Sequence, residues 1–255
     1  MHPRTVTRPA LLFAALACGA GIGGAARPAL AQEGAEPPKN LTLQGITSAT
    51  VAPRGLAFAS LSLTDRRISA GPRQDGSMAF GLGLGSAEDA VGVQITGFVT
   101  SLTDNFGDSG YFEVKAARRI SAGETPTYIA LAINGAGFGD ARRRETAGTV
   151  ALTSFRQVRF SDGGPLYPMM FTLGAGTNER NAERDPGIFG GIGIGLTKNL
   201  GLSAAWSGEY VNLGAALRFD GLDNFSIGAT LSDTFNQKNS RRIDVSFTYF
   251  LTDLF

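Results

Sequence analysis

From residue 55 onward the sequence alternates large apolar residues with small or polar ones, in short runs separated by clusters of Gly, Asp, Asn and Ser. Neighbouring residues of a β-strand point to opposite faces, so this period of two predicts strands with one bulky face and one small or polar face. Most runs are close to the about 9–11 residues that a tilted strand needs to cross a bilayer. We predict twelve strands, at 55–64, 76–85, 90–101, 110–120, 127–134, 148–160, 168–174, 187–197, 200–206, 210–219, 225–232 and 241–251.

Three of these runs show most clearly what the two faces carry. In 76–85, Met, Phe and Leu alternate with Ala and Gly, and in 187–197 Ile alternates mainly with Gly. In 210–219, leucines oppose Asn212 and Arg218. A soluble barrel carries charge on its outer face, whereas here the bulky face is the uncharged one, which favours contact with lipid. We interpret the alternating glycines as interior positions that give room or allow close packing.

Residues 241–255 have the most regular alternation and end the chain on Phe255. The apolar positions are Ile243, Val245, Phe247, Tyr249 and Leu251. This segment resembles the C-terminal strand of Gram-negative outer-membrane β-barrel proteins, although Asp253 stands where such strands usually carry another apolar residue. The resemblance implies an outer-membrane location and recognition by the barrel-assembly machinery. It also assigns Phe247, Tyr249 and Phe255 to an aromatic belt or assembly signal.

The predicted connections also fit a barrel of this class. Outer-membrane barrels have short periplasmic turns and longer external loops, so connection lengths should alternate. Five of the six odd-numbered connections are longer than every even-numbered one. The even number of strands also places both ends of the barrel on the same side of the membrane.

Two places along the chain fit the pattern less well. In 148–160 the apolar residues change face midway, because Phe155 falls opposite Val150 and Leu152; this indicates either a bulge or an amphipathic helix. Pro168 cannot donate a hydrogen bond to a neighbouring strand, so we expect the seventh strand to begin there.

The N-terminal residues are typical of a secretory signal. Arg4 and Arg8 precede an uncharged run rich in Ala, Leu and Gly, and Ala31 ends a small-x-small site. We predict cleavage after Ala31; the alternative is a lipoprotein anchor on Cys18. The predicted organisation is therefore a signal peptide at 1–31, a periplasmic lead-in or partial plug at 32–54, and the barrel at 55–255. Outside the signal, no apolar run approaches the ~20 residues of a membrane-spanning helix.

Composition narrows the chemistry of the mature chain. The only histidine, His2, and the only cysteine lie within the signal, so serine–histidine catalysis and thiolate metal sites are excluded. We predict no enzyme activity and no cofactor. Removing the three arginines of 1–31 from the 23 basic residues leaves 20 against 22 acidic ones, which argues against a nucleic-acid partner. Asp104 and Asp108 could bind calcium, but residues of this kind more often form turns, and we predict no metal site.

Candidate functional residues follow from the faces of the strands. Arg142, Arg143 and Arg144 lie in a predicted external loop, where they either pair with lipopolysaccharide phosphates or are solvated. Trp206 continues an apolar face and is assigned to the interfacial aromatic belt, with a buried core position as the alternative. The candidates for lumen-lining residues are Glu113, Lys115, Asn212, Arg218 and Asp244. They either line a water path or pair with one another across a plugged interior.

The sequence therefore predicts an all-β fold, a transmembrane antiparallel up-and-down barrel of about twelve strands, with eight to ten possible. The predicted function is porin-like passive passage of small solutes across the outer membrane, among outer-membrane lipid and lipopolysaccharide. One alternative is a closed barrel that serves as a structural anchor or surface-binding module. A second alternative is a soluble periplasmic β protein.

Overall fold

The computed structural model describes most of the chain from residue 39 onward. The predicted signal peptide 1–31 lies outside the described residues, as do residues 32–38 of the lead-in and the loop residues Asp104, Asn105 and Arg144. Among the described residues, no helix is long and apolar enough to cross a membrane. The described ranges are 39–67, 74–103, 106–123, 125–143, 145–181 and 184–255.

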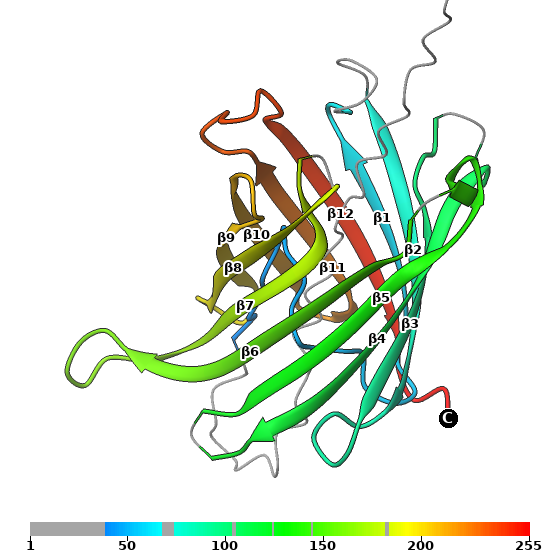
Figure 1. Cartoon of the computed structure of the whole chain (residues 1–255). Helices are drawn as coiled ribbons and strands as arrows, with labels where there is room; N and C mark the ends of the chain where they lie inside the picture. Colours follow the sequence, from blue (N-terminus) through cyan, green and yellow to red (C-terminus); the bar gives the residue numbers. More distant parts are fainter. Residues whose placement is uncertain (1–38, 68–73, 104–105, 124, 144, 182–183) are drawn as a thin grey trace, which may run out of the picture.

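The described chain forms twelve antiparallel strands and one short 3-10 helix, η1 (Figure 1). Each strand is paired with the strands that precede and follow it in the sequence. The strands are β1 (Ala57–Thr64), β2 (Asp75–Gly85), β3 (Gly92–Val99), β4 (Ser109–Ser121), β5 (Thr127–Gly139), β6 (Ala147–Arg159), β7 (Leu166–Arg180), β8 (Asp185–Gly195), β9 (Leu200–Trp206), β10 (Val211–Phe219), β11 (Leu222–Ser232) and β12 (Arg242–Leu251), and η1 spans Asp140–Arg143.

The sheet closes on itself because β1 pairs with both β2 and β12. Ser60 of β1 is opposite Ala79 on one side and opposite Thr248 on the other. Closure leaves no edge strand, so backbone hydrogen bonds are made between strands all round the ring, as a lipid environment requires. The predicted fold class and the predicted number of twelve strands are confirmed.

The bulky faces of the strands point outward. Leu131 of β5, Leu173 of β7 and Ile188 of β8 are 55%, 64% and 66% exposed, although each lies within a strand that is paired on both sides. The alternate positions are buried inside the ring, among them Thr153, which is 0% exposed, and Thr96. The outer face is thus apolar, whereas the inner face carries most of the small and polar side chains together with a few buried large ones, such as Phe58 and Phe189.

The two ends of the barrel differ in their connections. The short hairpins 86–91, 122–126, 160–165, 196–199 and 220–221 lie at one end, here called the turn end, and the C-terminus lies there as well (Figure 1). The opposite end, here called the loop end, has the longer connections 65–74, 100–108, 140–146 and 233–241, but also two of only four residues, 181–184 and 207–210, so the predicted alternation of lengths holds only in part.

Two strands extend furthest beyond the predicted bounds. β5 runs to Gly139 and β7 to Arg180, so parts of the predicted loops 135–147 and 175–186 belong to strands. These extensions read GAGFG and AGTNER and lack a sustained alternation of bulky and small residues. The pairing of β4 with β5 continues to Ser109 and Gly139 despite irregularities in its register, so the neighbouring strand and not local propensity determines this part of the structure.

Neither expectation for the run 148–160 was right. β6 is a single strand that pairs with β5 and β7 without a shift in register. Phe155 points into the barrel, where its ring meets that of Tyr128 edge-on at 5.7 Å between centroids. The apparent change of face therefore marks a place where the interior is packed with apolar side chains.

Pro168 lies within β7 and not at its start, as the sequence had predicted. It is opposite Gln157 of β6, whereas the pairing of β7 with β8 begins one residue later, at Met169. Proline is tolerated there because the pairing of β7 with β8 ends at Met169, so the nitrogen of Pro168 is not needed as a donor in that ladder.

Candidate functional site in the barrel interior

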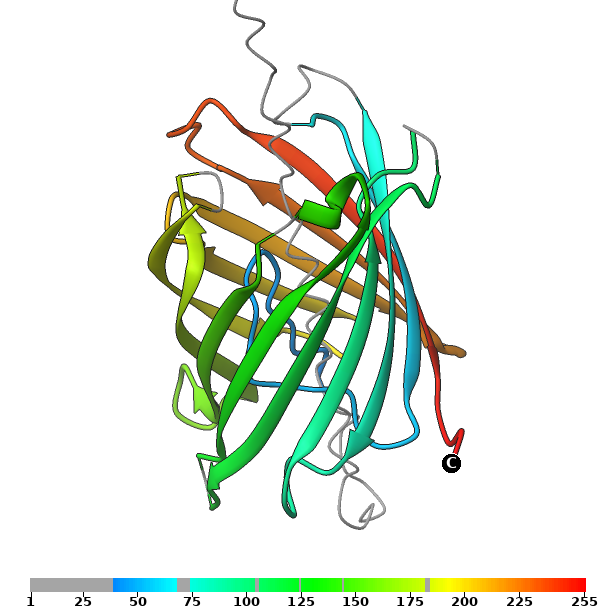
Figure 2. The same ribbon diagram turned by 45° about the vertical axis from the view of Figure 1, so that its right-hand side comes forward.

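Residues 39–54, here called the inner segment, lie inside the barrel (Figures 1 and 2). The segment starts at the turn end, where the backbone N–H of Asn40 donates to Thr197 O at 2.7 Å. It rises to Gly45, beside Asn212 near the start of β10, and returns to the turn end to enter β1. Gly45 has a φ of +82°, which suits the bend at the top of this path.

The inner segment joins no strand of the barrel, so wall side chains satisfy much of its backbone. The N–H of Ala49 donates to Thr153 Oγ1 at 2.8 Å, and the N–H of Ala52 donates to Gln94 Oε1 at 2.9 Å. Gln44 N donates to Ser203 Oγ at 3.1 Å in the same way. Buried backbone groups need such partners, and the inward hydroxyl and amide groups of the wall provide them.

Apolar contacts hold the same segment against the wall. Leu43, Ile46 and Ala49 are 1%, 4% and 0% exposed. They belong to one buried cluster with wall residues of β4 to β9, namely Ala117, Ala130, Ala151, Met170, Phe189 and Ala205. The interior of this part of the barrel is therefore a packed core and not an open channel.

Glycines of the wall leave room for the backbone of the inner segment. A Cβ atom added at Gly193 would overlap Thr42 O, and one added at Gly201 would overlap Asn40 O. On the opposite wall, a Cβ atom at Gly83 would overlap the carbonyl oxygen of Ala52. The alternating glycines thus lie where two backbones approach closely.

All five candidate lumen-lining residues occupy inward positions, but they are not gathered at one site. Lys115 is buried, with its Nζ 3.5 Å from Thr47 Oγ1 and from Ser48 O of the inner segment. Asn212 Nδ2 donates to Gly45 O at 3.2 Å. The other three candidates do not contact the inner segment through any described hydrogen bond: Glu113 and Arg218 are half-buried, and Asp244 lies nearer the loop end.

The residues assigned to the aromatic belt lie on the outer face. Trp206 and Tyr249 are 40% and 48% exposed, so the alternative of a core tryptophan is not what the structure has. Phe247 is half-buried among outward neighbours, with the ring of Phe225 at 6.5 Å. Phe255 follows β12 at the turn end and is 56% exposed. Of the three predicted loop arginines, Arg142 is exposed in η1, Arg143 ends that helix, and Arg144 lies outside the described residues.

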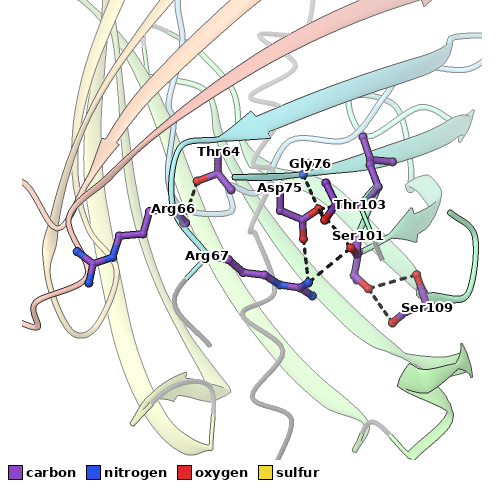
Figure 3. Close-up of polar contacts among 10 residues, drawn as sticks. Thr64, Arg66, Arg67, Asp75, Gly76, Ser101, Thr103 and Ser109 are labelled. Carbon is purple, nitrogen blue, oxygen red and sulfur yellow. Dashed lines mark hydrogen bonds and ion pairs between the residues drawn. The ribbon is translucent and has the colours of Figure 1, made fainter. Parts of the chain in front are cut away.

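A polar cluster at the loop end was not singled out from the sequence (Figure 3). Asp75 Oδ2 forms an ion pair with Arg67 Nη1 at 2.9 Å. Its other oxygen, Oδ1, accepts hydrogen bonds from Gly76 N, Ser101 Oγ and Thr103 Oγ1 at 2.7, 3.2 and 3.0 Å. Asp75 thereby ties the β1–β2 connection to the β3–β4 connection. In the sequence Asp75 resembles an ordinary turn residue. The only signal that sets it apart is that it shares the face of Ser77 and Ala79, which point into the barrel.

A second pair lies beside this cluster, on β12. Arg242 Nε is 3.3 Å from Asp244 Oδ2, which also accepts a hydrogen bond from Ser232 Oγ at 2.9 Å. The two clusters border one recess at the loop end, lined by residues of β1, β2, β3, β4, β12 and the β1–β2 connection.

The connection between β11 and β12 is organised by another buried carboxylate, Asp233. It accepts hydrogen bonds from the backbone N–H groups of Gln237, Lys238 and Ser240 at 2.6, 3.0 and 3.0 Å. Burial raises the pKa of this carboxyl, but the hydrogen bonds from Ser240 and Lys238 outweigh that effect and hold the pKa below its ordinary value. The loop is therefore fixed by a charged group at neutral pH.

No family model and no curated protein matches this sequence. The fold is similar to that of the KdgM porin, with a TM-score of 0.50 and 10% identity over 76% of this chain and 98% of that chain. The KdgM porin in complex with disordered oligogalacturonate has a TM-score of 0.49 at the same identity and coverage. The Acinetobacter baumannii outer membrane protein Omp33 has a TM-score of 0.45 and 11% identity, over 78% of this chain and 98% of that chain. At this identity the likeness to the KdgM porin concerns the fold alone, a closed antiparallel barrel of the kind found in outer-membrane porins.

Proposed function

We propose that this protein is an outer-membrane barrel that passes small polar solutes, and that the inner segment determines how far the passage is open. The observation that carries the proposal is the inner segment itself. It occupies the lumen, enters and leaves at the turn end, and is held by side chains and not by strand pairing. A segment attached in this way can move without breaking the ring of strands.

The outer face and the fold support a location in the outer membrane. Apolar side chains such as Leu173 and Ile188 are exposed around the wall, and they would be solvated poorly by water. The barrel closes without an edge and shares its fold with the KdgM porin. The C-terminal strand supports assembly by the machinery that inserts such barrels, and the signal-like N-terminus supports export.

The inner face away from the packed cluster supports passage of polar solutes. On β12 and β1 it carries hydroxyl groups, with Ser60 and Thr248 hydrogen-bonded to each other at 2.9 Å. A passive pathway needs no catalytic group, which agrees with the absence of histidine after His2. If the inner segment moved toward the turn end, the hydroxyl-lined wall would border a water path.

A closed barrel is the second candidate, and the burial of Leu43 and Ala49 favours it. These side chains are buried as completely as those of a protein core, and a segment held by such contacts would keep the lumen shut. Such a barrel would serve as an anchor that displays its loop-end connections.

Conductance in planar bilayers tests the proposal. The full-length protein is compared with a variant in which residues 40–52 are replaced by a Gly/Ser linker of equal length, which keeps the reach but removes the contacts. Heat-modifiable migration on gels establishes that both barrels are folded. We expect several-fold larger single-channel conductance from the linker variant. A folded linker variant that stays silent would contradict passage and support the closed barrel.

A further inference from the structure

The hairpin formed by β6 and β7 reaches beyond the closed ring at the turn end (Figure 1). The pairing of β6 with β5 ends at Ser154, and the pairing of β7 with β8 ends at Met169. Beyond these residues the two strands pair only with each other, as far as Arg159 and Leu166. Residues 156–168, here called the ribbon, therefore have no neighbouring strand on either side in the part of the chain that the structure describes.

The two faces of the ribbon continue the two faces of the barrel wall. Arg156 lies opposite Met169, and Met169 is in phase with Phe171, which is exposed on the outer face of the barrel. Residues that are directly opposite share a face, so Arg156 lies on the same side as the lipid-facing wall. Arg159 is in phase with Phe155, whose ring packs inside the barrel, and it therefore lies on the other face of the ribbon.

The outward face carries apolar residues as far as the end of the ribbon. Val158 lies opposite Tyr167, whose ring centroid is 5.5 Å from that of Phe160. The side chain of Phe160 is 66% exposed. Exposed large apolar side chains are solvated poorly by water, whereas aromatic residues are favoured at the boundary between acyl chains and headgroups. The outward face of the ribbon therefore suits the surface of a bilayer.

Two arginines on the outer face have no carboxylate partner. Arg156 is exposed on the ribbon, and Arg118 is exposed on β4, in phase with the outward Val114. Neither arginine takes part in the ion pairs found among the described residues. A positive charge on the lipid-facing wall is costly at the bilayer midplane and is tolerated near the bilayer surface. Both arginines therefore belong at the level of the lipid headgroups, on the turn-end side of the membrane.

Two hydroxyl groups lie on the outer wall next to these arginines. Ser154 is in phase with Arg156 on β6, and its Oγ is 2.9 Å from Thr127 Oγ1 of β5. β5 is also the strand that separates β6 from β4, which carries Arg118. Guanidinium and hydroxyl groups donate hydrogen bonds to phosphate oxygens, and a phosphodiester headgroup carries the negative charge that matches the arginines.

From these observations we infer that the outward face of the ribbon and the adjoining wall of β4 form a docking surface for negatively charged phospholipid. Phe160 and Tyr167 lie at the acyl boundary, while Arg156 and Arg118 donate to headgroup phosphates. A peptide strand is a poorer occupant, because exposed arginines and the proline Pro168 make the edges of the ribbon unsuited to pairing. The inference rests on the proposed location in the outer membrane, but it does not depend on whether the barrel conducts.

Native mass spectrometry of the folded full-length protein in a neutral detergent tests this inference, because the mass of each adduct identifies the bound lipid. Phosphatidylglycerol and phosphatidylcholine are titrated at about 0.15 M ionic strength, where exposed charges more than about 8 Å apart are largely screened. We expect phosphatidylglycerol to bind about fivefold or more tightly than phosphatidylcholine. Arg156→Gln should weaken the binding of phosphatidylglycerol about two- to fivefold. Arg159→Gln removes the same charge from the opposite face, so this matched control should bind as the wild type does.

The outcomes separate this inference from the question of passage. Equal affinity of the wild type for the two lipids, or equal losses in Arg156→Gln and Arg159→Gln, would overturn it whether or not the barrel conducts. Arg118→Gln is a second variant, on a strand within the ring; it should show a loss similar to that of Arg156→Gln, and unchanged affinity would remove β4 from the surface. Heat-modifiable migration establishes that each barrel is folded. A folded barrel that prefers phosphatidylglycerol but stays silent in planar bilayers would support the docking surface and contradict passage.

Discussion

The interior of the barrel has two sides that differ although their outer faces are alike. On the packed side, formed by β4 to β9, the inner face carries Ala130, Met170 and Phe189 and lies against the inner segment. On the hydroxyl side, formed by β11, β12 and β1, it carries mainly Ser and Thr, such as Ser60 and Thr248. Both sides present the same bulky residues to the outside. The difference teaches that lipid determines the residues of the outer face on both sides, whereas the inner face depends on whether the inner segment lies against it.

The largest expected effect is on the packed side, at Leu43. Leu43→Ala removes a side chain that is 1% exposed, and we expect the inner segment to be held less firmly by about 2–5 kcal/mol. Hydrogen exchange at Ala49 and Ala52 should become much faster. The strands should keep their protection, because the pairing of the wall does not involve Leu43.

One result for Leu43→Ala would contradict the distinction between the barrel wall and the inner segment that it encloses. If the whole barrel lost its heat-modifiable fold at a correspondingly lower temperature, the inner segment would be part of the structural core and not an occupant of it. Ser62→Ala on the hydroxyl side serves as the control and should leave exchange in the inner segment unchanged.

The next largest effect concerns the glycines of the wall. Gly193→Ala would place a methyl group against Thr42 O and Met170, and we expect the inner segment to be destabilised by about 1–3 kcal/mol. Gly148→Ala is the matched control: its added Cβ atom meets nothing within 4 Å, so it should be neutral or stabilise by about 0.4–1 kcal/mol. Protease sensitivity of residues 39–54 in the folded barrel measures both. Equal effects of the two substitutions would contradict a close approach at Gly193.

The strands could be predicted from the sequence because lipid imposes one rule on every outer face. The bulky positions, such as Leu213 and Tyr249, repeat with a period of two whatever lies inside. The inward parity of Lys115 and Asn212 followed from the same rule. Their contacts with Thr47 and Gly45 could not be predicted, because the alternation of residues along a strand carries no information on where residues 39–54 lie.

The errors have the same physical origin. At Phe155 the alternation predicts a bulge or a helix, because the apolar residues change face there; in a packed interior an inward phenylalanine is stable without either. The sequence predicts loops at the ends of β5 and β7 because these stretches lack a sustained alternation of bulky residues, yet the neighbouring strands hold them in the sheet. The pair Arg67 and Asp75 depends on two connections meeting at the loop end, and no local pattern encodes that meeting.

A smaller effect should follow from a single hydroxyl group on the packed side. Thr153 Oγ1 accepts a hydrogen bond from Ala49 N and shares another with Thr172 Oγ1 at 2.8 Å. Thr153→Val keeps the shape but leaves a buried N–H and a buried hydroxyl without this partner, at a cost of about 1–3 kcal/mol. Exchange at Ala49 should speed up, while Thr153→Ser should preserve most of its protection. Unchanged exchange in Thr153→Val would mean that this hydrogen bond does not hold the segment.

The smallest effect is expected from the corresponding change on the hydroxyl side. Ser60→Ala removes one neutral hydrogen bond, to Thr248 Oγ1 at 2.9 Å, and should lower the stability of the barrel by about 0.5–1.5 kcal/mol in urea unfolding. Exchange in the inner segment should not change, because no described hydrogen bond joins Ser60 to it. Faster exchange at Ala49 would show that the two sides are coupled through the ring, so that the hydroxyl side helps to hold the segment. Unchanged exchange would show that the inner segment is held by the packed side alone.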